Sequence, residues 1–210
     1  MASRYTNQKR LSMSLKQINE VSVILGSQSP RRKELLAAMD INFVVEVFPT
    51  EEQVDLRLSP EEIAEQIARN KLIPFETNGY EDKLVITADT IVVSPKGDIL
   101  GKPQSIAEAM SAIAELSGQE HLVITGVAIR FKEQYISFAE KTRVRFRSLD
   151  KQEIRYYVDK YHPMDKAGSY GIQEWIGRIG IESIEGSYEN VMGLPTQRLY
   201  AELKRLIQQK

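Results

Sequence analysis

The chain has 210 residues, of which 42% are hydrophobic, and its 28 Lys and Arg side chains nearly balance 29 Asp and Glu. This length suffices for one large domain or two small lobes around a cleft, and the near-neutral charge provides no overall field that favours nucleic acid or an anionic membrane. The absence of cysteine excludes disulfides, thiolate nucleophiles and cysteine metal sites, and is typical of a reducing compartment.

The first twenty residues are polar and lack the apolar segment of about 7 residues that a secretory signal needs. The longest nearly apolar run, residues 84–93, is far shorter than the roughly 20 residues of a membrane-spanning helix. We therefore expect a cytoplasmic protein without membrane contacts, in which residues 1–20 form an extension and 21–210 a single domain. Leu11, Leu15 and Ile18 are spaced like one face of a short helix that docks on this domain.

The first half of the chain alternates strand and helix signals. Residues 21–25 read as a strand that ends at Gly26, and Ser29 as N-cap with Pro30 behind it opens a helix to about Met39. The next predicted elements are a strand over 41–48, a helix over 59–72 with a capping box formed by Ser59 and Glu62, and a strand over 84–93.

The second half predicts an antiparallel hairpin between two helical regions. A capping box of Ser105 and Glu108 opens a helix that ends at Ser117 and Gly118. The later predicted elements are strands over 121–131 and 134–146 joined by a turn at Lys132 and Glu133, a helix over 149–160 and a last helix from about 195. Early alternation with a late hairpin predicts a mixed sheet in an α/β or α+β fold, and no repeat or linker divides the chain.

The segment "GSQSPRRKELL" places Arg31, Arg32 and Lys33 at the start of a helix, where the dipole is already positive. Backbone amides at a helix start, together with planar Arg side chains, form a binding site for phosphate oxygens. The alternative is that these cations face solvent or pair with Glu34. The Gly-Ser turn adds backbone donors at the same place, and we therefore favour an anion site that includes Ser27 and Ser29.

Asp89 interrupts the apolar run "LVITADTIVV". A carboxylate inside such a strand requires a cation, a metal ion or hydrogen-bond donors, because burying it alone costs several kcal/mol. It can serve a structural role at a bulge, but we favour a functional one. Downstream, Lys102 in "GDILGKP" resembles a P-loop lysine only superficially, since the spacing is one residue short and Pro103 replaces the Mg²⁺-binding hydroxyl.

Two glycine-containing segments complete the candidate site. In "HPMDKAGSYGIQEW", the glycines allow close approach to a ligand, Lys166 supplies a cation, and Gln173 offers the donor and acceptor needed to read a nucleobase edge, although a loop glutamine without such a role is more common. The segment "IEGSYENVMGLP" is expected to shape the wall of the same cleft. His121 and His162, the only histidines, cannot form an H-E-x-x-H zinc site, and His121 is expected to be structural. Without a persuasive Ser-His pair, what remains is metal-assisted phosphate chemistry.

In combination, "SQSPRRKELL", "ITADTIVV" with "LGKP", "MDKAGSYGIQ" and "GSYENVMGLP" closely resemble the Maf family of nucleoside triphosphate pyrophosphatases, in order from about Val23 to Leu203. The resemblance implies a mixed α/β fold similar to inosine triphosphate pyrophosphatases, two lobes around a deep cleft and often a homodimer. It also implies a divalent metal, usually Mg²⁺ with Mn²⁺ or Co²⁺ as substitutes. The implied reaction cleaves a nucleotide between the α and β phosphates, giving the monophosphate and pyrophosphate.

Three positions place the sequence within that family. Arg31, Thr90 and Gln173 match the branch that favours dTTP and UTP, whereas the 7-methyl-GTP branch tends to have Trp, Gln and Glu there. The family assigns Asp89 as the proton acceptor that activates water, and we expect it to bind the metal with Glu51 or Glu52, of which we choose Glu52.

The expected phosphate ligands are cationic side chains and backbone amides. They comprise Arg31, Arg32, Lys71, Lys102 and the amides that follow Ser27 and Ser29. Lys71 and Lys102 are grouped with Asp89 as catalytic, and Ser27, Ser29, Arg31, Arg32, Thr90, Lys166 and Gln173 as substrate-binding.

The sequence departs from the family at Glu174 and Trp175, where a Gly usually follows the Gln, and in the acidic segment "PTEEQVD". Two other functions stay open at this point. One is a purine pyrophosphatase, including one for 7-methyl-GTP, and the other is a nucleotide-binding regulator of cell division without enzymatic activity. A nucleic-acid-binding module is disfavoured by the near-neutral charge.

Overall fold

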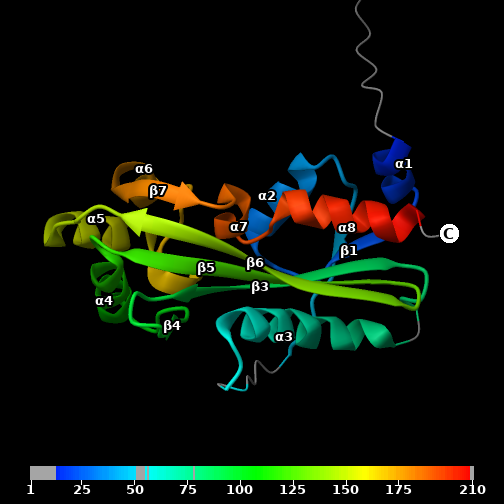
Figure 1. The fold of residues 1–210 in the computed structure, drawn as a ribbon, viewed down its shortest axis with the longest axis horizontal. Coiled ribbons are helices and arrows are strands. Elements are labelled where there is room, and N and C mark those ends of the chain that lie inside the picture. The colour runs from blue at the N-terminus through cyan, green and yellow to red at the C-terminus, as the bar shows by residue number, and fades with distance from the viewer. Residues whose placement is uncertain (1–12, 51–54, 56, 78, 209–210) are drawn as a thin grey trace, which may run out of the picture.

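A mixed sheet forms the centre of the computed structural model, which describes residues 13–50, 55, 57–77 and 79–208 (Figure 1). Its strands are β1 (Val23–Leu25), β2 (Val44–Val45), β3 (Leu84–Val93), β4 (Ile99–Leu100), β5 (Glu120–Phe131), β6 (Gln134–Phe146) and β7 (Ile181–Glu185). The order is β2-β1-β3-β5-β6-β7, with β4 paired to β3. β1 pairs in parallel with β2 and β3, and all other pairs are antiparallel. The predicted mixed α/β class is confirmed.

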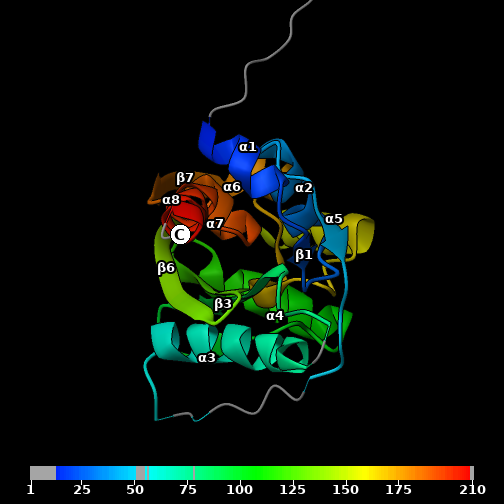
Figure 2. The same ribbon diagram turned by 90° about the vertical axis from the view of Figure 1, so that its right-hand side faces the viewer.

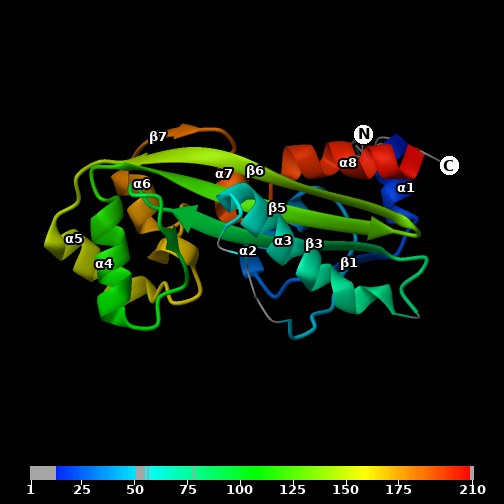
Figure 3. The same ribbon diagram turned by 60° about the horizontal axis from the view of Figure 1, so that its bottom comes forward.

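Helices cover both faces of this sheet. They are α1 (Met13–Asn19), α2 (Pro30–Ala38), α3 (Pro60–Leu72), α4 (Ile106–Leu116), α5 (Lys151–Tyr161), α6 (Trp175–Gly180), α7 (Tyr188–Met192) and α8 (Thr196–Gln208), with 3₁₀ turns η1 (Ile73–Glu76) and η2 (Ala167–Ser169). Figures 1 and 2 show α3 along one face and α1, α2, α7 and α8 on the other. Figure 3 shows α4, α5 and α6 gathered at one end of the long strands, while β1 and α8 lie toward the other end.

Strand β3 determines where a ligand can enter. Its residues 84–86 pair with β1 and residues 92–93 with β4, and none of the described strands pairs with residues 87–91 on that edge. Side chains alternate between the two faces along a strand. Asp89 therefore lies on the face that α3 covers, and its neighbour Thr90 on the face that α2 and α7 cover. The open edge lies beyond the carboxyl end of the parallel strand β1, where ligands bind in open α/β sheets.

Helix α3 packs unusually close to the sheet at Gly126. A Cβ atom at this position would lie 2.1 Å from the carbonyl oxygen of Ala64, and any other residue would push the helix away. Gly126 pairs with Asp89 in the β3–β5 register. The close approach brings the last turn of α3, which includes Lys71, to the Asp89 carboxylate. The predicted capping box fixes the other end of this helix, since Ser59 Oγ accepts from the Glu62 amide and the Glu62 carboxylate from the Ser59 amide.

Most predicted elements are confirmed, including the strand over 84–93, the hairpin around Lys132 and Glu133, and the final helix. The strand predicted over 41–48 is wrong in length, because β1 offers β2 only a short partner; Val44 is 53% exposed. At the start of α4 the capping box is half formed, since the Glu108 carboxylate accepts from the Gln104 amide instead of the Ser105 amide.

The N-terminal segment is helical where the structure describes it. Leu15 and Ile18 on α1 are buried in the same hydrophobic cluster as Leu203 and Ile207 on α8. Leu11 lies outside the described residues. The division into an extension over 1–20 and a domain over 21–210 stays a prediction.

Candidate active site

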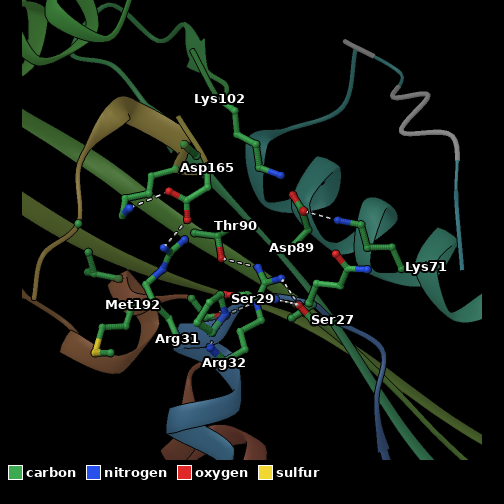
Figure 4. A pocket seen from close by; sticks show the side chains of 18 of the residues that line it. Ser27, Ser29, Arg31, Arg32, Lys71, Asp89, Thr90, Lys102, Asp165 and Met192 are labelled. Carbon is green, nitrogen blue, oxygen red and sulfur yellow. Dashed lines mark hydrogen bonds and ion pairs between the residues drawn. The ribbon is translucent and has the colours of Figure 1, made fainter. Parts of the chain in front are cut away.

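A cavity of about 400 Å³ opens at the free edge of β3 (Figure 4). Its walls come from the start of α2, the end of α3, the middle of β3, the segment 165–173 and the α7 region. All described residues of the predicted site lie on this wall. The structure thus brings together Ser27, Ser29, Arg31, Arg32, Lys71, Asp89, Thr90, Lys102, Lys166 and Gln173.

The start of α2 offers fewer free amides than the four of a typical first turn. Pro30 has no amide, and the amide that follows Ser29 is therefore that of Arg31. Ser29 Oγ accepts from the Arg32 amide at 3.5 Å, and Ser27 Oγ accepts from the Ser29 amide at 3.3 Å. This helix start therefore has fewer free amides than a typical first turn, and the side chains of Arg31 and Arg32 lie beside them on the cavity wall.

Arg32 is held by a neutral oxygen at each of its guanidinium nitrogens. Its Nε donates to the Gly193 carbonyl at 2.8 Å, Nη1 to Ser27 Oγ at 3.1 Å and Nη2 to Thr90 Oγ1 at 3.0 Å. Gly193 adopts φ +117° at the C-cap of α7, a conformation that favours glycine and turns this carbonyl toward Arg32. These contacts fix the plane of the guanidinium at the cavity wall.

Asp89 forms an ion pair with Lys71. Lys71 Nζ lies 2.5 Å from Asp89 Oδ1, and the two side chains are 21% and 16% exposed. The sequence required a partner for this carboxylate, and Lys71 meets that requirement. Lys102, on the segment after β4, is exposed and extends into the cavity on the same side as Asp89 in Figure 4.

The opposite wall has a chain of alternating charges. Arg31 Nη1 contacts Asp165 Oδ2 at 3.0 Å, Lys166 Nζ contacts Asp165 Oδ1 at 2.7 Å, and Lys166 Nζ also lies 3.2 Å from Glu174 Oε1. Burial alone would raise the pKa of Asp165, but the hydrogen bonds from Lys166 and Arg31 outweigh it and hold this pKa below its usual value. The Glu174 carboxylate also accepts a short hydrogen bond from the Tyr157 hydroxyl.

Among the described residues, five cationic side chains line the cavity against two carboxylates, those of Asp89 and Asp165. This excess of positive charge complements a polyphosphate. Gln173 lies on the same wall, and its Oε1 is buried without a hydrogen-bond partner in the described part of the chain. An acceptor left in this state is available to a ligand donor.

Sequence reasoning missed several contributors to this site. Asp165 lies in a quoted motif, but no local signal indicates that it pairs with Arg31, and Tyr157, which is hydrogen-bonded to Glu174, lies in an ordinary helical pattern. Phe48 and Phe75, which supply an apolar part of the wall, pack edge to face with ring centroids 5.0 Å apart. Only their hydrophobic character could have indicated a role, and core residues share it.

Of the predicted metal ligands, only Asp89 lies within the described residues. Glu51 and Glu52 lie outside the described residues, and the described residues contain no group of three or more His, Asp or Glu side chains that could hold an ion. Mg²⁺ is commonly bound by one or two carboxylates together with substrate phosphates, and the hard oxygen ligands of Asp89 at this cavity fit that mode.

His121 is buried and does not itself line the cavity, but its hydrogen-bond partner Tyr170 does. Its Nε2 is hydrogen-bonded to the Tyr170 hydroxyl at 2.7 Å, and burial lowers its pKa to about 4. No helix in the described part of the chain is long and apolar enough to cross a membrane.

The sequence model of the family described as "Maf-like protein" matches residues 22–206, and the chain belongs to this family. A relative from Bacteroides fragilis named dTTP/UTP pyrophosphatase is 49% identical over 193 residues, covering 91% of this chain and 100% of the relative. A protein of the same name from Porphyromonas gingivalis is 46% identical, covering 90% of this chain and 96% of its own length. A solved structure described as the Staphylococcus aureus Ham1 protein is 13% identical and covers 86% of this chain and 99% of its own, with a TM-score of 0.48.

Proposed function

We propose that this protein is a nucleoside triphosphate pyrophosphatase that hydrolyses dTTP and UTP to the monophosphate and pyrophosphate. The main structural support is the arrangement at the open edge of β3, where Asp89 lies beside Lys71 in a cavity lined by an excess of cations. The family membership and the two relatives named dTTP/UTP pyrophosphatase support the same reaction and substrates.

The phosphate chain is bound by residues from three elements. Arg31 and Arg32 at the start of α2, with Ser27 and Ser29, hold phosphate oxygens, and Arg32 is preoriented by its three neutral contacts. A charged, planar donor whose orientation is fixed before binding loses little freedom when the ligand arrives. Lys71 and Lys102 approach from the other side and stabilise the charge that develops on the leaving pyrophosphate.

Asp89 accepts the proton of the attacking water. Its carboxylate is oriented by Lys71 at 2.5 Å and lies on the wall of a cavity large enough to hold the substrate. A proton acceptor must lie within hydrogen-bond reach of the water that it activates, and the cavity edge of β3 permits this. Attack on the α phosphorus then releases pyrophosphate and leaves the monophosphate.

A divalent cation fits beside Asp89, with Glu52 as our choice for a second ligand and Mg²⁺, Mn²⁺ or Co²⁺ as the ion. When bound, such an ion supplies positive charge to the phosphate oxygens and lowers the pKa of a coordinated water. The protein's own contribution is a hard oxygen ligand at the cavity wall and cations that hold the triphosphate.

The base is bound on the wall formed by 165–173. Gln173 Oε1, buried and without a partner among the described residues, accepts a hydrogen bond from the base, and its amide group can donate one. Lys166 is only 9% exposed and is held between Asp165 and Glu174, and it therefore presents a fixed donor on the same wall. Uracil and thymine have both a ring N–H donor and carbonyl acceptors, which complement this pair.

A panel of nucleoside triphosphates, incubated with Mg²⁺ and analysed for products, tests this proposal. Monophosphate and pyrophosphate from dTTP and UTP, with little from 7-methyl-GTP, is the expected result. Diphosphate and phosphate as products would contradict the assigned reaction, and preferential cleavage of a purine nucleotide would contradict the assigned substrate. Binding of nucleotides without any cleavage would instead favour the regulator.

The homodimer that the family resemblance implies and the cytoplasmic location expected from the polar N-terminal residues stay predictions. Light scattering on the purified protein would determine the first, and fractionation of the cells that produce it the second. The absence of nucleic-acid partners likewise stays a prediction.

A further inference from the structure

A row of threonines crosses one face of the sheet, starting at the cavity. Thr90 on β3 pairs with Thr125 on β5, and Val123, two residues from Thr125, pairs with Thr142 on β6. Paired residues and residues two apart project to the same face. The three threonines therefore lie side by side under α7, and Thr125 and Thr142 are fully buried.

The hydroxyl protons in this row have only one consistent direction. Thr125 Oγ1 donates to the backbone carbonyl of Asn190 at 2.9 Å, because a carbonyl can only accept. Its single proton is then used, and the 3.0 Å contact between Thr90 and Thr125 must be donated by Thr90. Thr90 Oγ1 is left as an acceptor, and it receives the Nη2–H of Arg32 at 3.0 Å. The order of donation is Arg32 to Thr90 to Thr125 to Asn190.

The far end of the row is firmly anchored. The fully buried Asn190 side chain donates through Nδ2 to the Val123 carbonyl at 3.2 Å and to Thr142 Oγ1 at 3.0 Å. The backbone amide of Asn190 donates to the Oγ of Ser187, the N-cap residue of α7, at 3.2 Å. These bonds fix α7 on the sheet, and with it the carbonyl that accepts from Thr125.

We propose that Thr125 and Asn190 are positioning residues that orient Arg32 for phosphate binding, acting through Thr90. Neither residue lines the cavity. The same α7 region holds Arg32 a second time through the Gly193 carbonyl, and both the Nε and Nη2 ends of the guanidinium are therefore set by one element. The proposal rests on the proposed function in that Arg32 binds phosphate.

The row also changes the interpretation of Thr90. Its hydroxyl donates to Thr125 and accepts from Arg32, and the two contacts together orient this side chain along the row instead of into the base region. The side chain at this position thus influences the substrate by setting the direction of Arg32. A residue with a different donor pattern at 90 would turn the guanidinium without touching the base.

Replacing Thr125 with Val tests the proposal because it keeps the shape and removes both hydrogen bonds. The probe is inorganic tripolyphosphate, titrated by calorimetry in Mg²⁺ buffer. We expect Thr125→Val to bind it about tenfold more weakly, the size expected for the net loss of one hydrogen bond, and Thr125→Ser to restore most of the affinity. The matched control is Thr87→Val on the same sheet, which removes an equally buried hydroxyl that donates to the Ala68 carbonyl and lies outside the row.

A double-mutant cycle with Arg32→Ala separates positioning from a general loss of stability. If Thr125 acts through Arg32, Thr125→Val changes the tripolyphosphate affinity of the Arg32→Ala protein by less than about twofold. An undiminished tenfold effect in that background, or an equal loss in Thr87→Val, would overturn the proposal, as would a Thr125→Val protein that binds like the wild type.

Turnover distinguishes failure of this proposal from failure of the proposed function. A wild type that binds tripolyphosphate and cleaves no nucleotide would contradict the proposed reaction, while the binding cycle still decides the role of Thr125. If the wild type cleaves dTTP normally and Thr125→Val changes neither the KM for dTTP nor the affinity for tripolyphosphate, the positioning role alone is overturned. A wild type that cleaves dTTP but binds no tripolyphosphate would overturn the positioning proposal, which needs a phosphate site at Arg32, and would leave the proposed reaction standing.

Discussion

Replacing Asp89 with Asn should separate catalysis from binding. Asn keeps the shape and an oxygen that can still accept from Lys71, but it cannot take the proton of the attacking water. Proton transfer by a positioned group contributes roughly 100-fold to 10,000-fold to the rate, and we expect kcat for dTTP to fall at least about 100-fold.

The stability cost follows from the exposure of the ion pair. With side chains 21% and 16% exposed, the Lys71–Asp89 pair lies between a surface pair and a fully buried one. Loss of the charge should therefore lower the free energy of unfolding by about 1–2 kcal/mol, which corresponds to about 5 °C in Tm for a chain of this size. The variant should remain folded at assay temperature.

Three measurements would be compared for Asp89→Asn and Asp165→Asn. They are the rate of product formation by chromatography, the Tm by thermal melting, and the affinity for tripolyphosphate by titration. Because Asp89→Asn removes a negative charge from an anion site, its tripolyphosphate affinity in Mg²⁺-free buffer should equal or exceed that of the wild type. Asp165→Asn, in which Arg31 and Lys166 lose a partner, should alter KM more than kcat. An Asp89→Asn protein that retains more than about a tenth of wild-type kcat would refute the role of Asp89 as proton acceptor.

Three further predictions concern the surroundings of the site. The pKa of His121 is about 4 in the folded protein and about 6.5 in the unfolded chain, so the free energy of unfolding should fall by up to about 3 kcal/mol as the pH drops from 6.5 to 4. Urea unfolding should show a flatter dependence of this free energy on pH in His121→Gln than in the wild type. The same pH dependence in both proteins would contradict the prediction. Gly126→Ala, whose Cβ would lie 2.1 Å from a carbonyl of α3, should lower stability by at least about 2 kcal/mol in thermal melts, whereas Gly101→Ala, with nothing within 4 Å, should not; equal melts would refute the close packing. Glu174→Gln should raise KM for UTP about fivefold with little change in kcat, because Lys166 loses one of its two anchors; a fall in kcat alone would argue against a binding role.

The sequence predicted best those elements whose signals are local. The strand over 84–93 is a nearly apolar, β-branched run, and the Ser-Pro at the start of α2 sets a helix boundary by its own chemistry. β7 could not be predicted, because Ile184 and most of its neighbours are exposed and no alternating pattern arises. The strand over 41–48 was overestimated because its length depends on the short partner β1.

For the candidate site, the sequence likewise indicated individual residues but not the contacts between them. Arg32, Asp89 and Lys102 could be identified from motifs, but not the fact that adjacent residues Asp89 and Thr90 serve opposite faces of the sheet. Contacts such as Thr125 with Asn190 join positions 65 apart in the chain, and no local pattern encodes them. Tyr157 becomes recognisable as a neighbour of the site only when Glu174 is folded against it.

The most direct test of the central claim is turnover of dTTP by the wild-type protein in ¹⁸O-labelled water with Mg²⁺, followed by mass spectrometry of both products. Attack at the α phosphorus predicts one ¹⁸O atom in the monophosphate and none in the pyrophosphate. Label in the pyrophosphate would place the attack at the β phosphorus and contradict the assigned roles of Asp89 and the surrounding cations.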